Sequence, residues 1–332
     1  GVATIWCATA TIGSSTGTIS MDRQVYPVPF TYEELKEGDN TVLNDFAADG
    51  STNPVGTVTI TIAVTDPDET GTTIAKSTAP GTIKLITSGT TDTYGTFGGT
   101  VANAALAAST CSDSTAGCEL GPLTEVEQGS NVYELSVSIN ENMTMTDGST
   151  THQILGGQTV IQVTYADPNG DNGLATSVYD SSTFDLRNGS LTTDKSVYVM
   201  GQTMVITITD PDLDLDSATA ETYAMGLIEW DSSADSSELL STAQFTKNPG
   251  SLEETGDGTG VFQTTVDIPA TINSTALELG EVITLTYRDA GRAGENSVAP
   301  SSSDTVSVDV EAEIAISNFG ATITLDKTVY DW

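Results

Sequence analysis

Two groups of carboxylates at alternate positions could hold a cation. They are Asp66 with Asp68, and Asp210 with Asp212, Asp214 and Asp216. Alternate residues of an extended chain point to the same side, so these charges repel one another unless a cation lies among them. Oxygen ligands on a flexible loop suit Ca²⁺ better than Mg²⁺ or Zn²⁺. The pattern therefore predicts a structural Ca²⁺ site, first of all at 210–216; the alternative is a solvated acidic turn with proline at its bend.

A third acidic loop has oxygen ligands at its first, third and fifth positions. They are Asp167, Asn169 and Asp171. The loop is not an EF-hand, because its glycine comes one place late, at Gly173, and Val178 stands where the twelfth-position glutamate belongs. The corresponding loop later in the chain carries Arg288 and Arg292, whose charges are expected to take the place of a metal. We expect any cations to be bound differently in the two regions.

Catalytic chemistry has little support. A catalytic triad needs a histidine, and the chain has one, His152, whose Thr, Gln and Gly neighbours predict a solvent-facing loop. Carboxylate pairs for glycoside hydrolysis lie in turns without an aromatic sugar platform nearby. Gly98-Gly99 and Gly156-Gly157 lack the lysine or helix start that phosphate-binding loops need. We therefore expect a protein that is not an enzyme.

Cysteines and glycosylation sequons indicate a location outside the cell. Cys111 and Cys118 flank the turn-rich segment 112–117, which predicts a disulfide. Cys7 is expected to be a small buried side chain, or else to pair with another chain. Asn-Xaa-Ser/Thr sequons, which would mark outward loops, begin at Asn142, Asn188 and Asn273.

The charge balance excludes whole classes of partner. The 332 residues include 10 Lys and Arg against 46 Asp and Glu, a formal net charge of −36. Such a field repels nucleic-acid phosphates and anionic membrane surfaces. It attracts small cations, which are the partners that the charge predicts. No apolar stretch reaches the roughly 18 residues of a membrane span.

An internal repeat gives the organisation of the chain. A phrase ending in Asp-Arg/Lys-Xaa-Val-Tyr occurs at 19–26, 191–198 and 323–330. Behind the first two copies, further pairs of similar segments follow in the same order. They are 58–68 with 204–212, 129–139 with 258–268, and 158–167 with 281–289. Two units therefore share an order of strands.

Period-two alternation decides the fold class. Short strands of alternating apolar and Thr-rich positions are separated by Gly, Pro, Asn and Asp turns, which predicts an all-β protein of tandem, antiparallel, immunoglobulin-like β-sandwiches. Only 102–108 is a candidate helix, and a marginal one. The predicted units are 1–187, with long loop insertions, and 188–320. Residues 321–332 begin a third repeat, or form a terminal strand, and we expect the chain to be a fragment of a longer one.

The repeat phrases resemble those of surface-layer (S-layer) proteins of ammonia-oxidising archaea. The resemblance rests on the Leu-Asp-Lys-Thr-Val-Tyr-Asp-Trp phrase at 325–332, the strand ending in Asp-Pro-Asp at 212, and the segment 21–30. It covers the repeat junctions and most core strands, but not the loops at 71–121 and 217–257. It implies immunoglobulin-like domains that tile into a porous cell-surface lattice, with divalent cations at domain contacts and with glycans.

Three functional hypotheses follow. The first is a structural segment of a self-assembling S-layer, highly acidic and enriched in cations, in which the chain binds copies of itself. The second is an extracellular filament or adhesin subunit, assembled when the strand at 314–332, or that at 3–12, completes a neighbour's sheet. The third is a glycan-binding module. It is less favoured, because the chain has only three tryptophans, at 6, 230 and 332, with which to line an aromatic groove.

Overall fold

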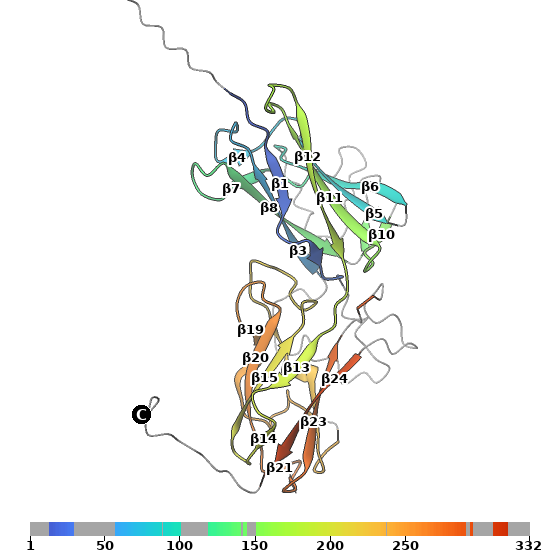
Figure 1. Cartoon of the computed structure of the whole chain (residues 1–332), viewed down its shortest axis with the longest axis vertical. Coiled ribbons are helices and arrows are strands. Elements are labelled where there is room, and N and C mark those ends of the chain that lie inside the picture. The colour runs from blue at the N-terminus through green and yellow to red at the C-terminus, as the bar shows by residue number, and fades with distance from the viewer. Residues whose placement is uncertain are drawn as a thin grey trace, which may run out of the picture. The chain divides into compact units, whose positions relative to one another are not determined.

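The computed structural model describes residues 13–29, 57–87, 89–100, 119–140, 142–144, 151–236, 238–289, 293–294 and 308–317 (Figure 1). These residues form two compact units. One holds the described residues of Gly1–Tyr26 and Val58–Phe184, and the other holds those of Pro27–Thr57 and Asp185–Trp332. The division between Phe184 and Asp185 lies close to the boundary that the repeat predicts.

The first unit is built from strands. Their bounds are β1 Thr18–Met21, β2 Val25–Tyr26, β3 Thr57–Thr65, β4 Thr73–Ile74, β5 Gly81–Thr87, β6 Thr90–Phe97, β7 Leu123–Glu125, β8 Val132–Asn140, β9 Asn142–Thr144, β10 Thr151–Gln153, β11 Thr159–Asp167 and β12 Thr176–Phe184. One sheet has the order β1-β3-β8-β7-β4, the other has the order β2-β12-β11-β5-β6, and β9 pairs with β10.

The second unit repeats this construction. Its elements are β13 Ser190–Thr193, β14 Val197–Tyr198, β15 Thr203–Thr209, β16 Thr222–Tyr223, the 3-10 helix η4 Met225–Leu227, β17 Ile228–Asp231, β18 Glu238–Leu239, β19 Lys247–Glu254, β20 Val261–Asp267, β21 Thr271–Ile272, β22 Thr275–Ala276, β23 Val282–Asp289 and β24 Val308–Ile316. The sheets are β13-β15-β20-β19-β16 and β14-β24-β23-β17-β18, and β21 pairs with β22. Strand for strand the order matches the first unit, which confirms the predicted repeat and the all-β, immunoglobulin-like fold.

Alternating burial explains why these segments are strands. Along β3 every second side chain is completely buried, while the threonines between them are partly exposed. In β15 the buried set is Met204, Ile206 and Ile208. Each sheet therefore turns one apolar face to the interior, and burying one such side chain contributes about 1.5–3 kcal/mol.

The Asp-Lys-Xaa-Val-Tyr phrase forms a loop closed by its own tyrosine. The Tyr198 hydroxyl donates to Asp194 Oδ1 (2.6 Å) and accepts the Lys195 N–H (2.9 Å). Asp194 Oδ1 also accepts the N–H of Val205 on β15 (2.8 Å), so the loop is fixed to the opposite sheet. The equivalent residues of the first unit are Tyr26, Asp22, Arg23 and Thr61. The third copy of the phrase lies outside the described residues.

Each unit closes on itself through a parallel pair. The two-residue strand that ends in this tyrosine pairs in parallel with the last strand of its unit, β2 with β12 and β14 with β24. In the second unit Ala315 N donates to Ser196 O (2.9 Å) and Ser317 N to Tyr198 O (2.8 Å). Residues 314–316, which the filament hypothesis assigns to a neighbour's sheet, belong to a sheet of their own unit. Residues 3–12, 318–332 and the candidate helix at 102–108 lie outside the described residues.

Candidate cation-binding site

Each Asp-Pro-Asp turn begins with a buried aspartate whose carboxylate is already engaged. Asp210, directly after β15, accepts the Tyr287 hydroxyl at Oδ2 (2.5 Å) and the Asp212 N–H at Oδ1 (2.8 Å). The equivalent acceptor and its two donors in the first unit are Asp66, Tyr165 and Asp68. The turn therefore directs its first carboxylate inward, between the sheets, and not along one side of an extended segment.

A glycine beside this aspartate lets the backbone approach closely. Gly189 N donates to Asp289 Oδ2 (2.6 Å). A Cβ atom on Gly189 would lie 2.9 Å from both a carboxylate oxygen of Asp210 and the ring of Tyr287, which is closer than real Cβ contacts. Gly17 occupies the same place in the first unit, where an added Cβ would lie 3.2 Å from a backbone oxygen.

The second aspartate of the later turn has a cation supplied by the chain itself. Arg187 Nε lies 3.1 Å from Asp212 Oδ1, the Arg187 N–H donates to Asp212 Oδ2 (2.6 Å), and Nη2 donates to Pro211 O (2.8 Å). In the first unit the equivalent aspartate, Asp68, has a backbone partner in place of the arginine: Ser15 N donates to Asp68 Oδ2 (2.8 Å). Asp212, which the alternate spacing predicted as a metal ligand, is an arginine partner here.

The predicted calcium loop of the first unit is also engaged with backbone. Asp167 accepts the N–H of Gly17 at Oδ2 (2.8 Å) and that of Asn169 at Oδ1 (2.7 Å). Asp171 Oδ1 accepts the Thr16 N–H (2.6 Å). These side chains fix the segment before β1 to the loop after β11, and the structure shows them as turn-forming groups.

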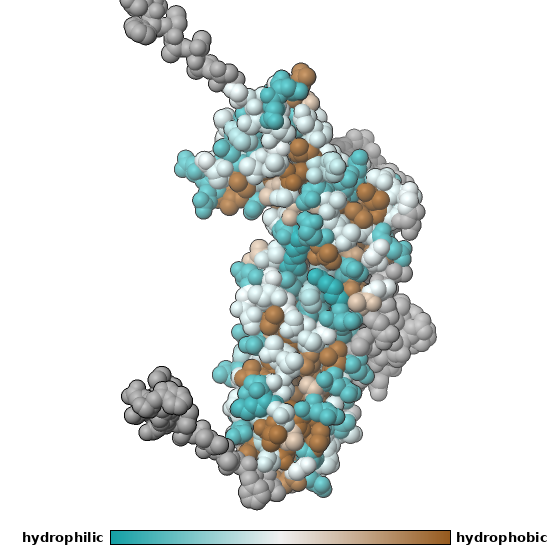
Figure 2. All heavy atoms as spheres, viewed as in Figure 1, coloured by the Kyte–Doolittle hydropathy of each residue, from teal (hydrophilic) through white to brown (hydrophobic). Residues whose placement is uncertain are grey.

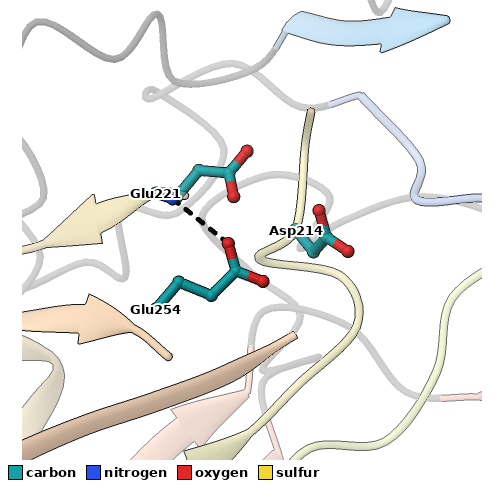
Figure 3. Close-up of side chains that lie close together, drawn as sticks. All are labelled: Asp214, Glu221 and Glu254. Atoms are coloured by element: carbon teal, nitrogen blue, oxygen red, sulfur yellow. Dashed lines mark hydrogen bonds between the residues drawn. The ribbon is translucent and has the colours of Figure 1, made fainter. Parts of the chain in front are cut away.

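A different set of carboxylates converges in the second unit. Within the described part of the chain, one group of three or more Asp, Glu, His or Cys side chains has ligand atoms all within 4.8 Å of one another: Asp214, Glu221 and Glu254. Asp214 lies in the loop after β15, Glu221 directly precedes β16, and Glu254 ends β19. All three are buried, and Figure 3 shows their carboxylates gathered around a common space. Of the residues predicted at 210–216, only Asp214 belongs to this group.

Backbone N–H groups hold Glu221 in place. Its Oε1 accepts from Leu215 N (3.1 Å) and Asp216 N (2.7 Å), and its own N–H donates to Glu254 Oε2 (3.2 Å, Figure 3). Its second oxygen, Oε2, is buried and has no hydrogen-bond partner. Asp216 itself is half-buried, and its Oδ1 caps the Ala218 N–H (3.0 Å).

Glu254 has a counterpart in the first unit. Glu254 Oε1 accepts the N–H groups of Thr259 (2.6 Å) and Gly260 (2.7 Å) in the turn before β20. Glu125, at the end of β7, does the same for the turn before β8, where the donors are Gly129 and Asn131. One oxygen of each glutamate is thus a turn cap. Among the residues that the structure describes, the carboxylate of Glu254 also faces two others, and that of Glu125 does not.

Burial and like charge raise the pKa values of these acids. Burial, followed by the charges of Asp212 and Asp289, raises the pKa of Asp210 to about 7. Burial raises the pKa of Asp212 to about 6 although Arg187 opposes it. Burial and the adjoining Glu254 raise the pKa of Glu221 to about 8. The second unit therefore concentrates carboxylates that are costly to ionise without a counter-charge.

Sequence reasoning missed Glu221 and Glu254. Neither has another acid at alternate spacing, and they meet because β16 pairs with β19. The similarity of the two units could have pointed to Glu254. Glu254 and Glu125 both stand just before a glycine-containing turn that connects two strands.

The histidine is not solvent-facing, contrary to prediction. His152 lies on β10, and its side chain is 10% exposed. Nδ1 is 2.9 Å from Thr87 Oγ1 and Nε2 is 2.8 Å from Asp92 Oδ2. The ring therefore joins the β9–β10 hairpin to the hairpin of β5 and β6. Its expected loop position was wrong because β9 and β10 form a hairpin that packs against this sheet edge.

The structure describes the three predicted glycosylation sites but not the cysteines. Asn142 and Asn188 are exposed. Asn273 is exposed too, but its Nδ2 donates to Asp235 (2.6 Å) and Glu238 (2.9 Å). The three cysteines, 7, 111 and 118, lie outside the described residues, and the disulfide stays a prediction.

Comparison with known proteins gives only distant likenesses. No protein-family model and no curated protein matches the sequence. Among solved structures, the Escherichia coli adhesin FdeC is 11% identical, with 91% of this chain and 65% of that one covered, and a TM-score of 0.23. The Yersinia pseudotuberculosis adhesin InvE (12%, 95% and 67% covered, 0.23) and murine CEACAM1b (9%, 89% and 100%, 0.19) are similar to the same extent. The chain thus spans less than two thirds of the length of FdeC.

Within the described segments, no helix has the length and apolar character needed to cross a membrane.

Proposed function

We propose that the chain is a structural, non-enzymatic segment of an extracellular surface assembly, in which immunoglobulin-like units follow one another and transmit tension. The supporting observation is the parallel closure of each unit. The chain passes through β2 or β14 early in a unit and leaves through β12 or β24, which run parallel to them. Tension on the two ends pulls these strands in opposite directions along their length, so their hydrogen bonds are loaded together and not one after another.

The tyrosine loop supports the same proposal. Tyr198 and Asp194 fix the start of β14, and Asp194 is bonded in turn to β15 in the opposite sheet. These bonds hold the segment that leads into β14 in place, so they add to the β14–β24 pair in resisting tension. The first unit has the same set of bonds around Tyr26.

Two assemblies fit this proposal, a surface-layer lattice and an adhesin-like filament. A net charge of −36 makes close packing of copies depend on salt or bridging cations, which is what a lattice of acidic proteins needs. On the face shown in Figure 2, described hydrophobic residues lie as separate spots among hydrophilic and neutral ones, which suits polar contacts between copies. A filament built by exchange of β24 would have to remove a strand that is paired on both edges.

A glycan-binding module has less support. Trp230 is completely buried and packs against Phe245, with ring centroids 5.3 Å apart. It is a core residue and offers no platform for a sugar; the tryptophans at 6 and 332 lie outside the described residues.

Single-molecule force spectroscopy tests the load-bearing proposal. The full chain is held by its two ends and stretched. We expect two separate unfolding events, one per unit, each with a distinct force peak, because the parallel pairs fail in shear. Unfolding of both units without a resolvable peak would contradict the proposal.

Electron microscopy of the purified chain distinguishes the two assemblies. The chain is incubated with CaCl₂ and, in parallel, with a chelator. Ordered two-dimensional sheets that disperse on chelation would support the lattice, and fibres would support the filament. Monomers under every ionic condition would exclude self-assembly by this segment.

A further inference from the structure

We propose that Asp214, Glu221 and Glu254 bind one Ca²⁺ ion inside the second unit. The proposal is independent of the surface-assembly role, because the site lies within one sandwich. It rests on a buried carboxylate oxygen without a donor and on the spacing of the three side chains.

The oxygen without a donor is Glu221 Oε2. Glu221 is 4% exposed, and Oε2 is buried with no hydrogen-bond partner, whereas Oε1 accepts two backbone N–H groups. A buried polar atom that has lost water and gained no partner costs about 1–3 kcal/mol, and more when it is charged. The neighbouring side chains that face it, from Asp214 and Glu254, are acceptors as well. A cation here supplies the missing partner of Glu221 Oε2 and offsets the negative charge of all three carboxylates.

The spacing fits Ca²⁺. Ca²⁺ binds oxygens at about 2.3–2.6 Å, so two ligand atoms on one ion lie at most about 4.6–5.2 Å apart. The ligand atoms of Asp214, Glu221 and Glu254 lie within 4.8 Å of one another. Mg²⁺ usually keeps several waters and binds through one or two carboxylates, whereas three buried carboxylates converge here. No histidine or cysteine belongs to the group, so a hard cation suits it better than Zn²⁺.

The backbone holds two of the three ligands in advance. Leu215 and Asp216 orient Glu221, and Thr259 and Gly260 orient Glu254. The loop after β15 and the turn before β20 are joined by the hydrogen bond from Asp210 N to Gly260 O (2.8 Å), and a cation would add a second connection between them. The ion would connect the ends of three strands of one sheet.

The first unit provides an internal contrast. Glu125 N donates to Thr72 O (2.8 Å), as Glu254 N does to Glu221 O (2.9 Å), so Thr72 occupies the place of Glu221. The residue four positions after Asp66 is Thr70, whereas four after Asp210 stands Asp214. The first unit therefore keeps the turn-capping glutamate but lacks the other two acids.

The competing explanation is a proton shared between Glu221 and Glu254. That arrangement needs no ion and gives no saturable uptake of Ca²⁺. Direct binding measurements separate the two explanations.

The test is isothermal titration calorimetry of CaCl₂ into the full chain, stripped of metal with a chelator and exchanged into buffer at neutral pH and about 0.15 M NaCl to screen diffuse ion binding. The wild-type chain, Glu221→Gln and Glu125→Gln are compared. Glu221→Gln keeps the size and the Oε1 acceptor but removes the charge; Glu125→Gln makes the same change at the capping glutamate of the first unit.

We expect one saturable site in the wild-type chain, Ca²⁺ affinity reduced at least about tenfold in Glu221→Gln, and affinity unchanged in Glu125→Gln. Thermal unfolding should show a Ca²⁺-dependent rise in the melting temperature of one transition, lost in Glu221→Gln. If Glu221→Gln does not fold, Asp214→Asn replaces it in both measurements, with the same expected loss of affinity. Absence of a saturable site in the wild-type chain would overturn the proposal in favour of the shared proton. Retention of the site in folded Glu221→Gln or Asp214→Asn would overturn the assignment of the ligands.

Discussion

Tyrosine hydroxyls fix two aspartates in each unit, one exposed and one buried. Tyr26 and Tyr198 bind the aspartate of the repeat phrase, and Tyr165 and Tyr287 bind that of the Asp-Pro-Asp turn. Burial and the bonded Asp194 raise the pKa of Tyr198 to about 12, so its hydroxyl remains a donor at physiological pH. Tyr198 is therefore both a strand residue and the residue whose hydroxyl closes the loop before the strand.

Replacing Tyr198 by Phe removes the hydroxyl and both of its hydrogen bonds with little change in side-chain volume. We expect Tyr198→Phe to lower the free energy of unfolding of the second unit by about 1–2 kcal/mol, because the Lys195 N–H and one acceptor position on Asp194 lose their partner. Urea denaturation of the full chain measures the loss. Tyr179→Phe is the control, since Tyr179 on β12 is 71% exposed and should change stability negligibly. Equal effects of the two substitutions would show that the Tyr198 hydroxyl does not stabilise the unit.

The buried Asp210 makes the stability of the second unit depend on pH. Its pKa is about 7 in the folded chain against an ordinary 3.8, so between these values the folded state keeps a proton that the unfolded state has lost. The stability due to that proton is complete below pH 3.8 and disappears as the pH rises through 7. In the presence of a chelator, we expect the melting temperature of the second unit to fall from pH 5 to pH 8.

Asp210→Asn is the matched variant, because an amide cannot ionise. Its melting temperature should depend less steeply on pH over the same range, measured by circular dichroism. A slope equal to that of the wild-type chain would assign the pH dependence to other groups.

At the level of strands, alternation and repetition made the fold predictable. The alternating patterns within 58–68 and 204–212 predicted the strands β3 and β15, and each of these strands buries every second side chain. The repeated phrase placed the equivalent strands of the two units in the same order. Alternation assigns a residue to a face, but it does not tell which strand lies beside it.

For this reason the candidate site was predicted only in part. Glu221 and Glu254 are 33 residues apart and meet through the pairing of β16 with β19, which no local pattern reports. Alternate spacing predicts that the aspartates after β15 share one face, whereas the turn directs Asp210 inward and brings Asp212 to Arg187. Only Asp214 was both predicted and found in the cluster.

The parallel closure of the second unit can be weakened at one position. Ser317→Pro removes the N–H that donates to Tyr198 O at the end of β24. We expect the force of one of the two unfolding events to decrease, while the other event, from the first unit, stays unchanged and serves as the control within the same molecule. An unaltered pair of forces would show that the β14–β24 pair does not bear the load.

At the level of the whole molecule, charge determines how copies approach each other. With a net charge of −36, copies repel over about 30 Å at 0.01 M salt and about 8 Å at 0.15 M. We expect the second virial coefficient from light scattering to fall as NaCl is raised over this range, and to fall further with CaCl₂ at equal ionic strength. Identical values for the two salts would exclude bridging by Ca²⁺ between copies and leave screening alone.

The close approach at Gly189 bears on how glycosylation of this protein should be tested. Asn188-Gly189-Ser190 reads as an acceptor tripeptide, yet its middle residue is dictated by steric contact with Asp210 and Tyr287. The acceptor should therefore be removed with Asn188→Gln or Ser190→Ala, because the side chains of Asn188 and Ser190 are exposed. A substitution at Gly189 would damage the sandwich and could be misread as the effect of a missing glycan.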